Sequence, residues 1–222
     1  MLKFIRYFLF VGVCFILFIF VLIYTNFNVH RNSDYTVFVQ NEYVIKDIVT
    51  LIDQSIETVK VKLWAPKKSI IFICRTNWCY RIFSPSYGYA SFEKAITIEG
   101  HIVAVNRNGA NRKILTHELT HVATANMKCN GKDQMPEWLS EGIAVFVSDD
   151  ERYSRANFLA SAEKNNMEID YVMKNNDKWN LITRVDPVLS YGAALYYVND
   201  MVHKAGEDSI GKVIVDYCNG GK

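Results

Sequence analysis

The first apolar segment of this chain is also its longest. No charged side chain interrupts residues Tyr7–Tyr24, and two basic residues, Lys3 and Arg6, precede them. These eighteen residues are close to the minimum that a helix needs to cross about 30 Å of hydrocarbon. A helix buried in a soluble core is a weaker interpretation, because this segment is apolar on every face. The pattern therefore predicts one transmembrane helix.

A cleaved secretory signal also has a basic start, but its apolar core is usually about 7–15 residues long and ends at a small-x-small cleavage site. The segment here ends in Ile23–Phe27, which offers no such site. An uncleaved signal anchor is therefore favoured. Because positive charges prefer the cytoplasmic side, Lys3 and Arg6 predict that residues after about position 28 lie outside the cytoplasm. His30 and Arg31 oppose this orientation weakly.

Beyond residue 34, apolar positions recur first at strand spacing and then at helix spacing. Alternation over Tyr35–Val39 predicts a strand, and the recurrence of apolar residues over Glu42–Lys62 predicts an amphipathic helix. Residues 75–94 form an aromatic, turn-rich stretch. Further strands are expected at Ser69–Cys74, Ala95–Ile98 and Ile102–Asn106, and further helices at Asn111–Met127, Pro136–Ser148, Tyr153–Asn165, Pro187–Lys204 after an Asp186 cap, and Asp208–Cys218.

Strands that precede helices indicate an α+β fold, with a small N-terminal sheet and a mostly helical C-terminal half. We divide the chain into three parts. Residues 1–27 are the cytoplasmic tip and transmembrane signal anchor, and residues 28–40 are a juxtamembrane linker and the first strand. Residues 41–222 form one domain, which is long enough to bury a core.

The charge balance gives no reason to expect a nucleic-acid partner. The chain has 25 Lys and Arg residues against 23 Asp and Glu residues, with a formal net charge of +2. No run of five or more like charges appears in the sequence. A nucleic-acid-binding chain usually carries a basic patch or stripe, so we expect other partners.

The cysteines fit an exported domain. Cys14 lies in the anchor, and four more follow it. An even number permits two disulfides, with three possible connectivities. Cys74 and Cys79 could close a short loop, which would leave Cys129 and Cys218 to tie the end of the chain to its middle. Four reduced thiols are the alternative, and a zinc–thiolate site is less favoured because the sequence has no CxxC spacing.

The chemistry of the chain is concentrated in the segment His117–His121, which reads His-Glu-Leu-Thr-His. Residues four apart lie on one face of a helix, one turn above the other. Two imidazoles in this arrangement can approach one metal ion from the same side, and Glu118 can reach a metal-bound water. A helix that carries two histidines by chance is the alternative.

A second segment supplies a third metal ligand. Pro136–Ala144 begins a further helix, and nineteen residues separate His121 from Glu141. Catalytic zinc usually takes three protein ligands and leaves one position for water, and two histidines with a glutamate are an attested set. Glu137 lies one turn before Glu141 and is the competing third ligand.

These two segments, HELTH and WLSEGIA, resemble those of the gluzincin metallopeptidases, and most nearly those of small bacterial peptidases of this fold. The resemblance covers roughly residues 40–220, but only the two segments are specific. It implies a zincin-like domain that hydrolyses peptide bonds. It also implies that His117, His121 and Glu141 are zinc ligands and that Glu118 is the catalytic acid and base.

Such a site predicts a hydrolytic mechanism. Zinc lowers the pKa of its bound water to about 7 and polarises the scissile carbonyl. Glu118 would take the water proton and deliver it to the leaving amine. The oxyanion needs a further donor, and Tyr191 resembles the tyrosine that opens a late helix in this family. Ordinary core packing is the alternative for one of thirteen tyrosines.

The sequence departs from the family at one position. Thermolysin-like enzymes carry an acid one turn after the third ligand, where it orients a metal-bound histidine. That position is Val145 here, and Asp149 and Asp150 follow two turns after Glu141. The outer-shell partners of the histidines are therefore left unassigned, and kinship with thermolysin itself is not close.

Together these features predict a single-pass protein of the cell (inner) membrane, with a zinc endopeptidase domain on the periplasmic or extracellular side. Its partners would be peptide or protein substrates and the membrane. The alternative is a catalytically silent zinc-binding module of the cell envelope, or a peptidase dedicated to one envelope protein. Glu118 counts against a silent module, because a structural zinc site needs no base.

Overall fold

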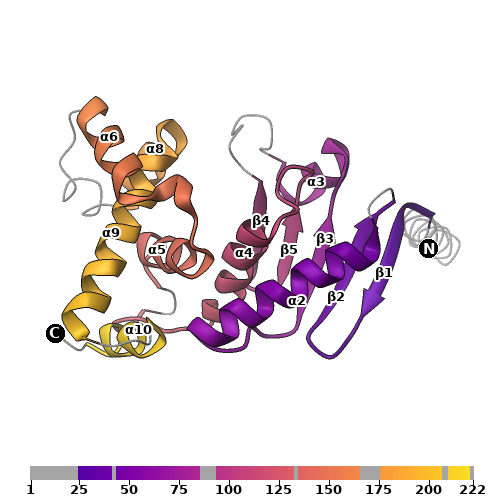
Figure 1. Ribbon diagram of the computed structural model, residues 1–222, viewed down its shortest axis with the longest axis horizontal. Helices are drawn as coiled ribbons and strands as arrows, with labels where there is room; N and C mark the ends of the chain where they lie inside the picture. The colour runs from indigo at the N-terminus through magenta and orange to yellow at the C-terminus, as the bar shows by residue number, and fades with distance from the viewer. Residues whose placement is uncertain are drawn as a thin grey trace, which may run out of the picture.

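The computed structural model describes residues 25–41, 44–85, 94–132, 135–165, 176–206 and 210–220. These residues combine one five-stranded sheet with eight α-helices and one short 3₁₀ helix, η1 (Figure 1). The strands are β1 (Phe27–Arg31), β2 (Tyr35–Gln40), β3 (Ser69–Ile73), β4 (Ala95–Ile98) and β5 (Ile102–Val105). The helices are α2 (Ile45–Lys62), α3 (Asn77–Phe83), α4 (Arg112–Thr124), α5 (Glu137–Ser148), η1 (Glu151–Tyr153), α6 (Arg155–Asn165), α8 (Asn176–Val185), α9 (Pro187–Ala205) and α10 (Ile210–Cys218).

Every element predicted from the hydrophobic pattern is confirmed within a few residues, and four elements are additional: β1, α3, η1 and α8. Residues 28–31 were expected to be linker, but they belong to β1, which pairs antiparallel with β2. The side chain of Asn32 closes the turn between them by accepting hydrogen bonds from the backbone N–H groups of Asp34 and Tyr35. Helix α3 occupies part of the stretch expected to be turn-rich, and α8 follows residues that the structure does not describe.

The sheet has the order β1-β2-β3-β5-β4. Its three central strands are parallel, and the two edge strands run antiparallel to their neighbours. Because parallel neighbours need a crossover connection, α2 lies between β2 and β3 in the chain. A hairpin turn that includes Glu99 and Gly100 connects β4 to β5, and both residues have positive φ.

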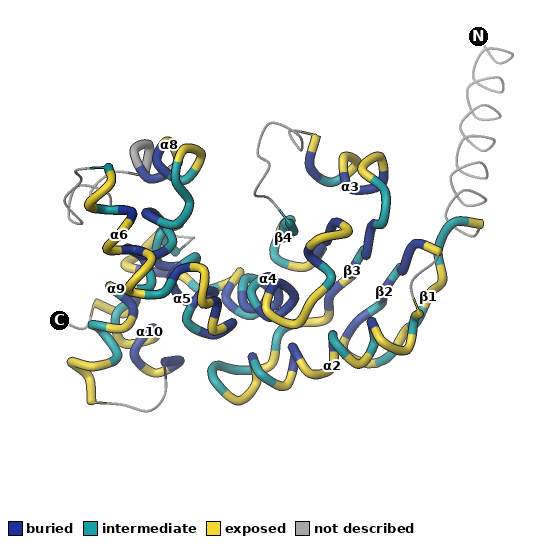
Figure 2. Tube along the Cα trace, turned by 45° about the horizontal axis from the view of Figure 1, so that its top comes forward, coloured by how far each residue is buried: buried dark blue, intermediate teal, exposed yellow. Residues whose placement is uncertain are grey.

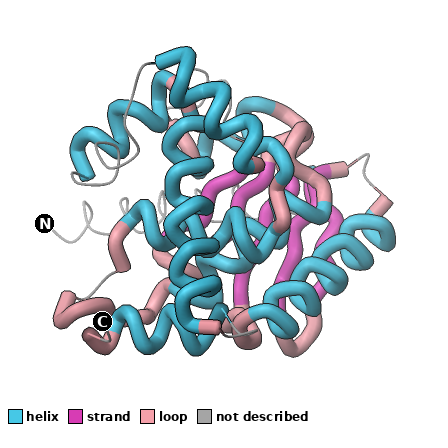
Figure 3. Tube along the Cα trace, turned by 60° about the vertical axis from the view of Figure 1, so that its left-hand side comes forward, coloured by secondary structure: helices cyan, strands magenta, loops and turns pink. Residues whose placement is uncertain are grey.

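The main core lies between one face of the sheet and the helices α2 and α4. Alternate residues of the central strands, such as Val37, Ile71 and Val103, are fully buried and pack with Ile52 of α2 and Leu119 of α4. Figure 3 shows helices lying over one face of the strands. We call this the inner face of the sheet. Burial of these apolar surfaces is the main source of stability for a domain of this kind.

The C-terminal half is helical and packs beside the sheet (Figure 1). Helix α5 contacts both α4 and α9, so it links the two halves. Gly142 lets α5 approach α9 closely, because a Cβ atom there would lie 2.7 Å from the carbonyl oxygen of Ala194. A second apolar cluster, centred on Phe158, Trp179 and Leu189, holds α6, α8 and α9 together.

Two disulfides are present, with the connectivity that the cysteine spacing favoured. Cys74 bonds to Cys79, which fixes the start of α3 to the end of β3. Cys129 bonds to Cys218, which ties the last residue of α10 to the connection between α4 and α5. The prediction of two disulfides is therefore confirmed, and four reduced thiols are not what the structure contains.

The predicted transmembrane segment, Tyr7–Tyr24, lies outside the described residues, as does Cys14. Among the helices that the structure describes, none combines the length and the apolar character that a membrane span requires. Strand β1 begins at Phe27, three positions after that segment. The folded domain thus starts almost immediately after the apolar run in the sequence.

Candidate metal centre

Helix α4 carries both histidines of the HELTH segment. Asn111 caps the helix, because its side-chain oxygen accepts a hydrogen bond from the backbone N–H of Ile114, which is the usual way an N-cap residue satisfies a free donor. Leu115, Leu119 and Val122 are buried and hold one side of the helix in the core. The apolar side of α4 thereby fixes the direction in which His117 and His121 point.

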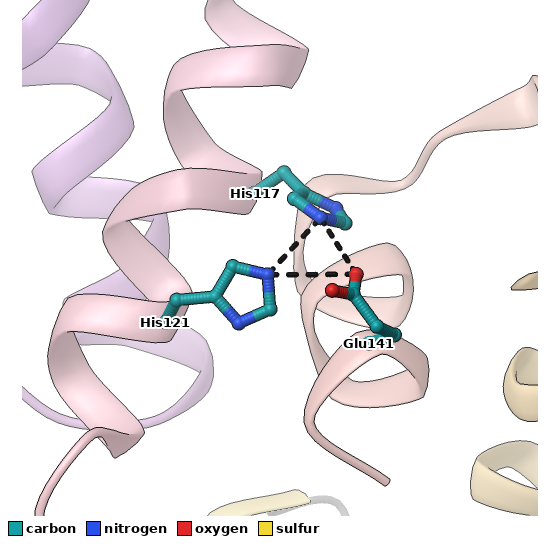
Figure 4. A group of neighbouring side chains, drawn as sticks. All are labelled: His117, His121 and Glu141. Atoms are coloured by element: carbon teal, nitrogen blue, oxygen red, sulfur yellow. Dashed lines mark hydrogen bonds and ion pairs between the residues drawn. The ribbon is translucent and has the colours of Figure 1, made fainter. Parts of the chain in front are cut away.

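Helix α5 brings Glu141 to the two imidazoles. Its apolar residues Leu139 and Ile143 are fully buried in the same core as Leu119. Figure 4 shows His117 and His121 on one helix and Glu141 on the neighbouring helix, with all three side chains directed at a common point. Two successive helices are therefore positioned by one shared core.

The ligand atoms of these three residues have the spacing of a metal site. The Nε2 atom of His117 lies 3.1 Å from Oε2 of Glu141 and 3.2 Å from Nε2 of His121. The His121 Nε2 atom lies 3.5 Å from the same carboxylate oxygen. Ligands about 2.0–2.1 Å from a tetrahedral zinc ion lie about 3.3 Å from one another. The three atoms therefore fit the coordination sphere of one such ion.

Glu137, the competing ligand, is placed differently. Its side chain is exposed and lines the cavity beside the site. Among the described residues, three potential metal ligands converge, and they are His117, His121 and Glu141. The prediction that Glu141 would join the two histidines is confirmed as a matter of position.

The electrostatics of the triad favour a bound cation. Burial acts to lower the pKa of His121, but the charge of Glu141, the hydrogen bond to Glu141 and the charge of Glu118 together outweigh burial and raise this pKa. Burial likewise acts to raise the pKa of Glu141, but the positive charge of His121 and hydrogen bonds to both imidazoles lower it. A buried carboxylate is stable only beside a compensating positive charge. That charge is either a proton on the imidazoles or a metal ion between them.

Ser140 contacts the far side of His121. Its hydroxyl oxygen lies 3.0 Å from Nδ1 of the imidazole. If Nε2 binds a metal ion, Nδ1 is the ring nitrogen that carries hydrogen, and it donates a hydrogen bond to the Ser140 hydroxyl. Metal-bound histidines usually donate their second N–H in this way, which fixes the ring and its tautomer. Ser140 therefore fills one of the outer-shell positions that the sequence left unassigned.

Asp150 is a buried acid just after α5 that interacts with the charge of His117. The chain reverses at Asp149, which has the left-handed backbone conformation that often ends a helix. The reversal returns the next residue toward the site, and Asp150 is buried. Burial acts to raise the pKa of Asp150, but hydrogen bonds and charge from Arg152, together with the His117 imidazole, lower it. The hydrogen bonds of the Asp150 carboxylate come from Arg152, so its influence on His117 is electrostatic.

Glu118 lines the same cavity as the two histidines. The cavity has a volume of about 620 Å³, and its walls come from β4, α4, α5 and α9. The Glu118 carboxylate is almost fully buried and accepts a hydrogen bond of 2.7 Å from the hydroxyl of Thr97 in strand β4. The predicted base therefore lies at the site with a donor that holds one of its oxygens.

Tyr191 is also at the cavity. It lies in α9, and its ring centroid is 6.2 Å from that of His117 and 4.9 Å from that of Tyr153. Burial, followed by the charge of Glu141, raises the pKa of Tyr191 well above its usual value. The phenol therefore keeps its proton at neutral pH and can donate a hydrogen bond into the cavity.

The sequence did not identify Thr97 or Ser140 as site residues. Each is a common polar residue, and each reaches the site through a contact between separate elements. The sequence did contain a signal for Ser140, because it directly precedes Glu141 and must lie beside the metal-facing side of α5. Thr97 could be found only once β4 was known to lie next to α4.

Comparison with known proteins adds no family to these observations. No protein-family model matches the chain. A search of curated proteins likewise finds no significant match. The case for the function of this chain therefore rests on its own residues and their geometry.

Proposed function

We propose that this chain is a membrane-anchored, zinc-dependent peptidase of the gluzincin type, with a zincin-like domain outside the cytoplasm. The observation that carries the proposal is the convergence of His117 Nε2, His121 Nε2 and Glu141 Oε2 within 3.1–3.5 Å of one another, beside the buried carboxylate of Glu118. A purely structural zinc site is normally closed by four protein ligands. Three ligands next to a cavity leave a position for water.

The residues of the site have distinct tasks in this proposal. His117, His121 and Glu141 would hold the zinc ion, which supplies a nucleophilic water and polarises the substrate carbonyl. Glu118 accepts the proton of the attacking water and passes it to the nitrogen of the leaving amine. Thr97 holds the Glu118 carboxylate in place through its hydroxyl. The Tyr191 hydroxyl donates to the oxygen on which negative charge develops.

The cavity also offers a place for an extended peptide. Strand β4 is the last strand in the sheet order, and Ala95, Ile96 and Thr97 line the cavity. A peptide can add to a sheet edge through main-chain hydrogen bonds. Such an arrangement would present an internal peptide bond to the site, which favours endopeptidase activity.

The test combines metal analysis with cleavage of a peptide library by the purified full chain in lipid nanodiscs. We expect about one zinc ion per chain and cleavage at internal peptide bonds. Glu118→Gln should retain zinc and lose activity, because the amide cannot accept the water proton. Glu163→Gln, on α6, serves as the matched control with unchanged activity.

Other outcomes would separate the alternatives. Zinc bound in a full complement, with no peptide or envelope protein cleaved, would support the silent module in place of the peptidase. Cleavage confined to one envelope protein would support a dedicated peptidase. A folded chain that binds no divalent metal would contradict the proposal altogether.

A further inference from the structure

The second face of the sheet, opposite α2 and α4, is mostly apolar, with Arg31, Thr36 and Gln40 as its polar residues on β1 and β2. Because side chains alternate along a strand, the neighbours of the core residues point to this side. Val29, Phe38, Ile70, Phe72, Ile98 and Ile102 define what we call the outer face. Val29 and Ile70 are 51% and 38% exposed. A sheet face that meets water is normally polar, so this composition points to a covered face.

Helix α3 covers one end of the outer face. Its buried residues Cys79 and Tyr80 pack with Ala104 of β5, and Phe83 lies with its ring centroid 4.5 Å from that of Phe72. The Cys74–Cys79 disulfide holds the helix there. Figure 2 shows α2 and α3 on opposite sides of the sheet.

The side of α3 that points away from the sheet is itself apolar. Trp78 and Ile82 lie one turn apart on this helix, and they are 51% and 65% exposed. Arg81 lies between them in the sequence and is also exposed. Exposed aromatic and aliphatic side chains with a neighbouring arginine are the composition of surfaces that rest in the lipid headgroup region.

The chain itself connects this surface to the predicted anchor. Phe27, the first residue of β1, packs against Phe72 and Phe38 on the outer face. Thr25 and Asn26 alone separate Phe27 from the apolar segment Tyr7–Tyr24. Even if fully extended, these two residues would span at most about 7 Å. An anchor that ends at the bilayer surface therefore holds this side of the domain against the headgroups.

We propose that the outer face and the exposed side of α3 dock on the bilayer that holds the anchor. Trp78, Ile82 and Val29 enter the boundary between headgroups and acyl chains, and Arg31 and Arg81 contact lipid phosphates. This inference rests on the membrane location given under the proposed function, but not on catalysis. Docking would orient the metal centre, because α4 lies on the opposite side of the sheet and would face away from the lipid.

Trp78 provides a natural probe for this contact. The chain has four tryptophans, and the other three lie elsewhere: Trp64 donates to the carbonyl of Ala123, Trp138 lies on α5, and Trp179 is buried in the helical half. The full chain is reconstituted in vesicles of phosphatidylcholine and phosphatidylglycerol. A portion of the phosphatidylcholine is brominated near the headgroup end of its acyl chains, so that bromine quenches tryptophans at that depth.

We expect bromine to quench part of the wild-type emission, and Trp78→Phe to lose most of the quenched intensity. Trp138→Phe, the matched control, should keep it. Zinc content and circular dichroism of both variants report that the fold is retained. Equal quenching of wild type and Trp78→Phe would overturn the proposal, and so would failure of the chain to float with the vesicles.

A second copy of the chain is the competing occupant of this face. In that case Trp78 would be shielded from bromine, and its emission would depend on the ratio of protein to lipid, which would also overturn the proposal. Peptidase activity is measured in the same vesicles. If the chain shows the expected quenching but cleaves no peptide, only the peptidase proposal is contradicted. If the chain cleaves peptides but lacks the quenching, only the docking proposal is contradicted.

Discussion

Glu141 and Glu137 lie one turn apart on α5, but their surroundings differ. The carboxylate of Glu141 is 3.1 and 3.5 Å from the two imidazole Nε2 atoms, whereas Glu137 has an exposed side chain at the cavity. Loss of a residue that only orients a metal ligand weakens metal binding by up to about 100-fold. Because Glu141 would bind zinc directly, we expect Glu141→Gln to weaken zinc affinity by more than that. Glu137→Gln, the matched control, should bind zinc as the wild type does. Competition with a fluorescent zinc chelator measures both, and equal affinities would contradict the assignment of the third ligand.

Substitution of Tyr191 tests its proposed role as the hydrogen-bond donor to the oxyanion. Because its pKa is raised, the phenol is protonated across the neutral range and acts by donating its hydrogen. We expect Tyr191→Phe to lower kcat by about 100-fold or more, as removal of an oxyanion donor does in other hydrolases. KM and zinc content should change little. Tyr196→Phe, on the same helix, is the control, and unchanged turnover in Tyr191→Phe would remove the proposed role.

At the residue scale, the sequence was informative where the spacing alone determines the geometry. His117 and His121 lie four apart in one helix, so their common direction follows from helix geometry. The contacts of Thr97 with Glu118 and of Ser140 with His121 join residues 21 and 19 positions apart. They depend on how β4 and α5 pack against α4, which no local pattern specifies.

At the scale of elements, the close approach of α5 and α9 gives a prediction at Gly142. Alanine is favoured over glycine within a helix by about 1 kcal/mol. A Cβ atom at position 142, however, would lie 2.7 Å from the Ala194 carbonyl oxygen and 2.8 Å from Val198. Overpacking of this kind costs about 1–3 kcal/mol. We therefore expect Gly142→Ala to lower the free energy of unfolding, as measured by denaturant titration.

Gly211 is the matched control for this change. A Cβ atom there would lie 3.2 Å from the ring of Trp64, a milder contact than the 2.7 Å contact at position 142. We expect Gly211→Ala to have a smaller effect than Gly142→Ala or to stabilise α10. If both variants were equally stable, the close packing of α5 on α9 would not be the reason for glycine at position 142.

Asp186 stabilises the start of α9, the helix that carries Tyr191. Its carboxylate accepts hydrogen bonds from the backbone N–H groups of Val188 and Leu189 and from the side chains of Ser161 and Asn165 in α6. Loss of an N-cap costs about 0.5–2 kcal/mol. We expect a loss of this size in Asp186→Ala, and a smaller one in Asp200→Ala, which removes an exposed ion pair on the same helix.

The same carboxylate makes stability depend on pH. Burial acts to raise the pKa of Asp186, but hydrogen bonds from Ser161 and from the start of α9 lower it below its usual value. A lowered folded-state pKa stabilises the fold above the unfolded value of about 3.9, and this contribution is lost as pH falls through the folded value. Unfolding curves between neutral and acid pH should therefore show a smaller loss of stability in Asp186→Ala than in the wild type.

The elements that the sequence missed lack a strong pattern of their own. Strand β1 reads Phe-Asn-Val-His-Arg, and it depends on pairing with β2. Helix α3 has two buried residues, and the Cys74–Cys79 disulfide holds it on the sheet. The longer helices α2, α4, α5 and α9 were predictable because their apolar residues recur on one side. Asp186 and Pro187 also marked the start of α9 correctly.

At the scale of the whole molecule, the sequence indicated mixed α and β structure but not the order or direction of the strands. Parallel pairing of β3 with β5 places α3 and β4 between them in the chain, and nothing local specifies that arrangement. The two disulfides were favoured from spacing, yet the pairing of Cys129 with Cys218 depends on α10 lying beside the α4–α5 connection.

These disulfides enclose loops of very different length, so we expect different contributions to stability. Chain entropy predicts about 4–5 kcal/mol for a separation of 89 residues and about 2 kcal/mol for a separation of 5. Replacement of both Cys129 and Cys218 by alanine should lower the denaturation midpoint more than the matched change at Cys74 and Cys79. The reverse order in denaturant titrations would show that local packing outweighs loop length.

The longer disulfide also closes residues 129–218 into a covalent ring. Glu141 and Tyr191 lie inside the ring that Cys129 and Cys218 close, and His117 and His121 lie on the chain that leads into it. One cut of the backbone within the ring opens it without separating any of these residues from the others. A nicked protein would therefore migrate as one species until it is reduced and as two fragments afterwards, while its metal-binding residues stay on a single molecule.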